Sequence, residues 1–197
     1  MNTKVKMCGL RRETDIEYVN RLLPDYIGYV FAKKSKRFIS PEQAARFTQL
    51  LDKRIIPVGV FVDERIDNVI ELIKSGTIKI VQLHGNENEE YIKALQKENI
   101  IVIKAFIVES EEDCKRAENS PADHILLDSG MGSGKPFDHT LLKNIKRPYF
   151  LAGGLDCESA GDAVRLLAPY ALDVSSGIET DGFKDFEKMK EFMDSIY

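Results

Sequence analysis

FLAGGL at residues 150–155 and LDVSSGIE at residues 172–179 are two short apolar runs that each end in small residues. This is the pattern of a buried strand followed by a tight turn. Glycine and serine allow several backbone N–H groups to approach one anion, and the positive end of a following helix adds to the attraction. The two stretches therefore predict a pair of strand-to-helix turns that hold a phosphate group.

Both runs belong to a series of eight short apolar segments that alternate with amphipathic ones along the 197 residues. Most of the eight are rich in β-branched or aromatic residues, which is typical of buried parallel strands. The predicted strands cover residues 4–8, 26–31, 57–62, 80–83, 101–106, 124–127, 149–152 and 172–174. Eight strand–helix units close most simply into a (β/α)8 TIM barrel, so we expect an α/β fold with one domain over residues 1–197.

A doubly wound open sheet is the alternative fold for such a series. That fold usually carries its glycine-rich turn after the first strand, whereas here the first strand is followed by GLR at residues 9–11 and the glycine turns come last. TIM barrels commonly build a phosphate site after strands seven and eight, which favours the barrel. Helix starts are also readable: Ser40 precedes Pro41, and Ser110 precedes Asp113 in a capping pattern.

Composition excludes several classes of protein. A formal net charge of -4 argues against nucleic acid as an obligate partner, because proteins that bind it usually carry a basic face. Three scattered cysteines do not make a disulfide framework and favour a reducing compartment. The sequence contains neither a signal-peptide pattern nor an apolar run long enough for a membrane span. We therefore expect a cytoplasmic protein with no membrane partner.

Chemically capable side chains stand at the ends of several predicted strands, where TIM barrels carry their active sites. They are Cys8, His84, Asp128, Asp173 and Ser175. Cys8 also fits a buried apolar position and His84 a satisfied rim histidine. Asp128 directly follows an apolar run, so its carboxyl group must be paired, protonated or functional.

A further glycine-rich segment, SGMGSGKPFD at residues 129–138, follows Asp128. It reads either as a connector or as a lid over the substrate, with Lys135 near enough to assist an anion. The segment lacks the strand–turn–helix context of a dinucleotide site, and the chain has neither a Walker motif nor a cluster with zinc-ligand spacing. We therefore expect a reaction that needs no cofactor and no metal.

The order of these motifs resembles the phosphoribosylanthranilate isomerase family of tryptophan biosynthesis over nearly the whole chain. The matching segments are KMCGL at residues 6–10, VQLHG at 81–85, LD at 127–128, GSGKPFD at 132–138, LAGGL at 151–155, DVSSGIE at 173–179 and GFKD at 182–185. The lid segment departs from the family pattern at Met131, Ser133 and His139, which puts the packing of the lid in question rather than the reaction.

The resemblance implies a TIM-barrel isomerase that carries out an Amadori rearrangement of a phosphosugar, with Cys8 as general base and Asp128 as general acid. It also implies that Arg37 holds the anthranilate carboxylate and that His84 lines the site. The remaining substrate-binding residues that it implies are Gly132, Ser133, Gly134, Gly153, Gly154, Asp173, Ser175, Ser176 and Gly177.

This chemistry places demands on both groups. Opening the ribose ring requires a proton near neutral pH, so we expect burial to raise the pKa of Asp128. An ordinary thiol is only slightly ionised at pH 7, so we expect Arg11, Arg12 or the start of the first helix to stabilise the Cys8 thiolate.

Two other functions remain open from the sequence. One is the related sugar-phosphate isomerase of histidine biosynthesis, or a bifunctional barrel, although those barrels generally use two aspartates and Cys8 replaces the first. The other is a binding barrel that keeps the phosphate site without catalysis. The sequence leaves the oligomeric state open between a monomer and a homodimer.

Overall fold

The computed structural model describes residues 3–128, 141–142 and 145–196, and its centre is a closed barrel of eight parallel strands. The strands are β1 (Lys4–Cys8), β2 (Tyr26–Val30), β3 (Ile56–Phe61), β4 (Ile80–Leu83), β5 (Ile101–Ile107), β6 (His124–Asp128), β7 (Tyr149–Ala152) and β8 (Ala171–Val174). Each strand pairs with the next, and β1 also pairs with β8. This closure excludes an open sheet, and the predicted barrel is confirmed.

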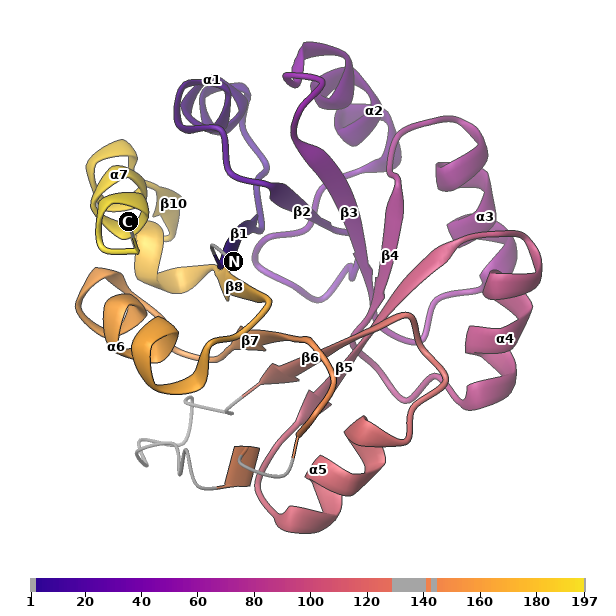
Figure 1. The fold of residues 1–197 in the computed structure, drawn as a ribbon. Helices are drawn as coiled ribbons and strands as arrows, with labels where there is room; N and C mark the ends of the chain where they lie inside the picture. The colour runs from indigo at the N-terminus through magenta and orange to yellow at the C-terminus, as the bar shows by residue number, and fades with distance from the viewer. Residues whose placement is uncertain (1–2, 129–140, 143–144, 197) are drawn as a thin grey trace.

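Helices surround the barrel on its outside (Figure 1). They are α1 (Glu13–Leu22), α2 (Pro41–Leu50), α3 (Ile66–Lys74), α4 (Glu89–Lys97), α5 (Glu111–Glu118), α6 (Cys157–Leu167) and α7 (Phe186–Asp194). Each of α1 to α5 connects one strand to the next parallel strand, and α6 connects β7 to β8. Most of the link from β6 to β7, residues 129–140 and 143–144, lies outside the described residues.

The predicted strands differ from the observed ones by at most one residue at either end. The difference that bears on function is at β6, which continues to Asp128 because that residue pairs with Ile107 of β5 and Ala152 of β7. Both predicted helix starts are confirmed. Ser40 accepts a hydrogen bond from the Gln43 N–H at the start of α2, and Ser110 accepts one from the Asp113 N–H at the start of α5.

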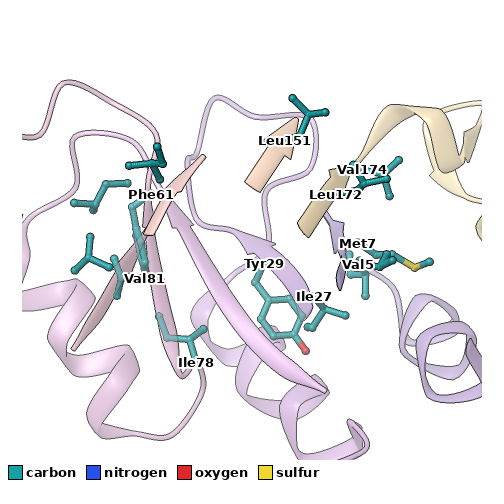
Figure 2. Close-up of a cluster of buried hydrophobic side chains, with 14 of the residues drawn as sticks. Val5, Met7, Ile27, Tyr29, Phe61, Ile78, Val81, Leu151, Leu172 and Val174 are labelled. Atoms are coloured by element: carbon teal, nitrogen blue, oxygen red, sulfur yellow. The ribbon is translucent and has the colours of Figure 1, made fainter. Parts of the chain in front are cut away.

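Two apolar clusters hold the fold together. The smaller one fills the inside of the barrel with alternate strand residues, including Tyr26, Ile103, Leu126 and Phe150. The larger one lies between the strands and the helices, and Figure 2 shows part of it around Tyr29. Since the strands are buried on both faces, both alternating sets of side chains are largely apolar. This smaller cluster fills the barrel below the carboxyl ends of the strands.

After β8 the chain forms a 3-10 turn, η3 (Ser176–Ile178), and then a small hairpin before α7. The hairpin pairs β9 (Glu179–Thr180) with β10 (Phe183–Lys184) in antiparallel fashion. Its two turn residues, Asp181 and Gly182, have φ values of 52° and 77°, which an Asp-Gly hairpin turn favours. The hairpin returns Lys184 toward the start of the 3-10 turn.

No helix within the described part of the chain has both the length and the apolar character needed to cross a bilayer.

Candidate active site

A pocket of about 600 Å³ opens at the carboxyl ends of the strands. Nine of the residues predicted from the sequence line it: Cys8, Arg37, His84, Asp128, Gly153, Gly154, Asp173, Ser175 and Ser176. They come from β1, β6 and β8 and from the loops after β2, β4, β7 and β8, so the closed barrel brings together residues that are far apart in the sequence. Predicted residues Gly132, Ser133 and Gly134 lie outside the described part of the chain.

Gly177 fits closely against the loop after β7. A side-chain carbon added at Gly177 would lie 2.0 Å from the carbonyl oxygen of Leu155, so only glycine permits this approach. Gly153 and Gly154 have φ values of 101° and 62°, a region that side chains disfavour. The two turns predicted from the sequence therefore pack against each other.

The helix that follows the first of these turns is already capped. Asp156 Oδ1 accepts a hydrogen bond from the Ser159 N–H at 2.9 Å at the start of α6. Because the Asp156 carboxylate already interacts with the positive N-terminal end of α6, this helix is poorly suited to bind a phosphate. The second turn leads directly into η3.

Cys8 is buried at the end of β1, beside an ion pair. Lys6, two residues earlier on the same face, is fully buried, and its Nζ lies 2.8 Å from Asp173 Oδ1 on β8. The Ser175 hydroxyl donates to the Cys8 carbonyl oxygen at 3.0 Å. Gly28 of β2 leaves room for the sulfur, because an added side-chain carbon there would lie 2.6 Å from Cys8 Sγ.

The charge environment of Cys8 differs from the prediction. Burial raises the pKa of the Cys8 thiol, and the ammonium groups of Lys6 and Lys184 oppose that rise. The Arg11 guanidinium donates to the carbonyls of Lys36 and Gly182, and that of Arg12 to the Lys184 carbonyl. The main cations that act on the Cys8 thiol are thus Lys6 and Lys184 rather than the two arginines.

Arg37 is held by a carboxylate of the protein. Its Nε and Nη2 each donate to one oxygen of Glu179 at 2.7 Å, and Lys184 Nζ donates to Glu179 Oε1 at 2.7 Å. Burial alone would raise the pKa of Glu179, but the hydrogen bonds from Arg37 and Lys184 lower it to about 2. Glu179 is thus ionised at neutral pH, and one edge of the Arg37 guanidinium is occupied.

Asp128 and His84 face each other in the pocket, with His84 Nε2 3.6 Å from Asp128 Oδ2. Gln82 Nε2 lies 3.2 Å from His84 Nδ1. In the tautomer in which Gln82 Nε2 donates to Nδ1, the ring proton of neutral His84 is on Nε2, facing Asp128. The Asp128 side chain is 25% exposed and lines the pocket.

Comparison with known proteins shows the family of this chain. The model of the family "N-(5'phosphoribosyl)anthranilate (PRA) isomerase" matches residues 5–195. The chain belongs to this family. The isomerase of Thermoanaerobacter sp. (strain X514) is 43% identical over 200 residues, covering 98% of this chain and 97% of that protein. The isomerase of Endomicrobium trichonymphae is 47% identical over 195 residues, covering 95% of each chain.

Solved structures of PRA isomerases have the same fold. The crystal structure of the Thermotoga maritima enzyme has a TM-score of 0.91 and 38% identity, with 98% of each chain covered. A second PRA isomerase structure, in complex with reduced 1-(o-carboxyphenylamino)-1-deoxyribulose 5-phosphate, has a TM-score of 0.89 and 36% identity over 98% of each chain. The family likeness therefore spans nearly the whole barrel.

Four buried polar groups of this site have no role in the sequence-based prediction. They are Lys6, Gln82, Glu179 and Lys184. Lys6 had a readable signal, since alternation along a strand puts it on the same face as Cys8. Gln82 had the same kind of signal, since it stands two residues before His84. Glu179 and Lys184 had none, because their contact with Arg37 joins segments that only the fold brings together. Within the described residues, no group of three His, Cys, Asp or Glu side chains could hold a metal ion.

The ion pairs of Glu179 predict how the stability of the folded chain depends on pH. Because the folded-state pKa of Glu179 is about 2 and its ordinary value is 4.5, its contribution is complete above pH 4.5 and is lost as the pH falls toward 2. Glu179→Gln should be less stable than wild type at pH 6, with the difference shrinking by on the order of 1 kcal/mol at pH 3.5. Urea unfolding at both pH values measures this, and an unchanged difference would contradict it.

Proposed function

We propose that this chain catalyses the Amadori rearrangement of N-(5-phosphoribosyl)anthranilate to 1-(2-carboxyphenylamino)-1-deoxy-D-ribulose 5-phosphate in L-tryptophan biosynthesis, with Cys8 as general base and Asp128 as general acid. The observation that carries this proposal is the order of strands around the pocket. Cys8 ends β1 and Asp128 ends β6, and β7 and β8 lie between them in the closed barrel. A phosphate held by the turns after β7 and β8 would bring the sugar between thiol and carboxyl.

Asp128 begins the reaction by giving its proton to the ribose ring oxygen. The bond from that oxygen to C1 breaks, and the anthranilate nitrogen forms a protonated Schiff base with C1. The Asp128 carboxylate that remains faces the Nε2 side of His84 at 3.6 Å. An N–H donor there stabilises the carboxylate after the transfer, which supports His84 as a positioning residue for the acid.

The Cys8 thiolate then removes the proton on C2, which the Schiff base has made acidic. The electrons of that C–H bond form an enolamine, which tautomerises to the ketone of the product. One proton enters from the carboxyl group and one leaves to the thiolate, so the isomerisation is balanced. Both transfers use side chains of this chain, and the reaction as written requires no cofactor.

Arg37 is proposed to bind the anthranilate carboxylate through the edge that Glu179 does not use. Glu179 takes Nε and one Nη2 hydrogen, which leaves Nη1 and the second Nη2 hydrogen as a two-pronged donor. The residue is 30% exposed in its side chain and lines the pocket. Backbone N–H groups around Gly154, Ser176 and Gly177 are proposed to bind the 5-phosphate, with Asp173 and Ser175 beside the sugar.

The proposal is tested with Cys8→Ser and the purified wild-type chain. Wild type should convert phosphoribosylanthranilate and restore growth of a tryptophan auxotroph that lacks the isomerase. Since serine is a far weaker base than a thiolate at neutral pH, Cys8→Ser should lose at least about 10²-fold in kcat while phosphate still binds. Steady-state kinetics give kcat, and calorimetric titration with inorganic phosphate gives the Kd for phosphate.

Cys114→Ser is the matched control. Cys114 is also buried, but it is on α5, where its sulfur contacts the Leu141 carbonyl, and it does not line the pocket. Its activity should remain within a few-fold of wild type. Failure of the folded wild-type chain to convert the substrate would favour a binding barrel, and full activity of Cys8→Ser would reject Cys8 as the base.

A further inference from the structure

Lys184 is a buried cation that the reaction described above does not use. Its side chain is 1% exposed, and its Nζ donates to Glu179 Oε1 at 2.7 Å and to the Ser175 carbonyl at 2.8 Å. Burying an ammonium group is costly unless it is paired, and burial lowers the pKa of Lys184. This costly group binds the carbonyl of Ser175, a residue that lines the pocket.

The ion pairs of Lys184 leave its cluster with a net positive charge. Glu179 is shared between Arg37 and Lys184, so this cluster contains two cations and one carboxylate. Lys6 has its own carboxylate, Asp173, and these two groups act on the Cys8 thiol in opposite directions. Lys6 acts on the thiol more strongly than Asp173 does, and the cluster of Arg37, Glu179 and Lys184 adds a further positive charge to that of Lys6.

Ser175 links the cluster to the end of β1. Lys184 binds the Ser175 carbonyl, and the Ser175 hydroxyl binds the Cys8 carbonyl. Two hydrogen bonds thus join the ammonium group to the backbone that carries the thiol. The hairpin turn at Asp181 and Gly182 holds the lysine in place.

We propose that Lys184 is a positioning residue that acts through Cys8, and that its buried positive charge stabilises the thiolate which serves as the general base. An ammonium ion in a poorly solvated place interacts with a nearby anion much more strongly than it does in water. The inference rests on the proposed role of Cys8. It adds a residue from the β9–β10 hairpin to the reaction, although Lys184 does not itself contact the reacting atoms.

The test measures ionisation of Cys8 directly in the free protein. Iodoacetamide reacts with thiolates, so the rate of Cys8 alkylation at different pH values reports its pKa. Peptide mass spectrometry separates Cys8 from Cys114 and Cys157. The groups that face this thiol are Lys6 on β1, Asp173 on β8, Lys184 on β10, Arg37 after β2, and His84 and Asp128 across the pocket.

Lys184→Gln removes the charge but can still donate to the Ser175 carbonyl. Its alkylation midpoint should rise by about one pH unit, and kcat/KM at neutral pH should fall about tenfold and recover at high pH. Lys184→Arg keeps the charge and should leave the midpoint near that of wild type. Lys190→Gln makes the same change of net charge on an exposed position of α7 and should shift nothing.

A structural role for Lys184 gives a different result. If the lysine only supports the loop, Lys184→Gln loses activity equally at all pH values and its alkylation midpoint stays at the wild-type value, which would overturn the inference. Lys184→Met is the second neutral variant, and it fills the apolar space if glutamine prevents folding. We expect the alkylation midpoint of Lys184→Met to rise as it does in Lys184→Gln.

These measurements can be separated from the test of the proposed function. Alkylation needs neither substrate nor turnover, so a raised midpoint in Lys184→Gln supports the electrostatic effect even if the chain fails to isomerise phosphoribosylanthranilate. A fully active Cys8→Ser together with a raised midpoint would reject the base and keep the charge effect. An unshifted midpoint together with an inactive Cys8→Ser would reject the role of Lys184 alone.

Discussion

Asp128→Asn should reduce kcat/KM for phosphoribosylanthranilate by about 10³-fold, because an amide cannot give a proton to the ribose ring oxygen. The change is nearly isosteric, and the Asp128 side chain lines the pocket at 25% exposure. It should therefore leave the fold and the phosphate site intact. Steady-state kinetics measure the loss, and calorimetric titration with inorganic phosphate should give a Kd within about twofold of wild type.

Asp67→Asn serves as the control for this experiment. Asp67 is on α3, with its side chain 77% exposed, and it contacts only the exposed Arg65 among the described ion pairs. The variant should behave as wild type in both measurements. Full activity in Asp128→Asn would rule out this residue as the general acid, and loss of phosphate binding in it would indicate that the pocket had changed shape.

The barrel could be predicted from the sequence because its signals are local. Each strand is a short run of apolar residues, and the helix starts at Ser40 and Ser110 follow from capping chemistry in adjacent residues. The residues at strand ends could be predicted for the same reason. Once the barrel is assumed, the carboxyl ends of all eight strands must meet at one face, which brings Cys8 and Asp128 to one pocket.

The charges around the thiol could not be predicted in this way. Arg37 and Glu179 are 142 residues apart, and they meet because barrel closure brings the chain after β8 close to the loop after β2. A sequence gives no signal for a contact of that kind, and Arg11 and Arg12 were assigned to the thiolate because they are near Cys8 in the chain. Adjacency is a poor guide at a barrel mouth, where neighbours in space come from different strands.

The position of Lys6 could be predicted from the sequence only in part. Strand alternation places it on the face of Cys8, but an inward-facing lysine in a buried strand contradicts the apolar pattern. The parallel register explains it, because Lys6 of β1 is opposite Asp173 of β8. A polar residue at an inside position of each of two strands that close the barrel is therefore a sequence signal for a buried ion pair.

That pair gives the largest expected effect on stability. Asp173→Asn should lower the free energy of unfolding by about 3–5 kcal/mol, because it leaves the fully buried Lys6 ammonium without a counter-charge. Lys6→Met should cost less, since Asp173 lines the pocket and its charge can still be solvated. Urea unfolding at pH 7 measures both, with Asp67→Asn as an exposed carboxylate control that should change stability by less than about 0.5 kcal/mol.

The double variant Lys6→Met with Asp173→Leu separates the pair from its surroundings. Replacing both charges by apolar groups leaves neither one unpaired, so it should recover most of the stability that Asp173→Asn loses. Equal costs for the two single variants would mean that pocket solvent does not reach Asp173. A double variant as unstable as Asp173→Asn would show that the inside of the barrel depends on the shape of these side chains rather than on their pairing.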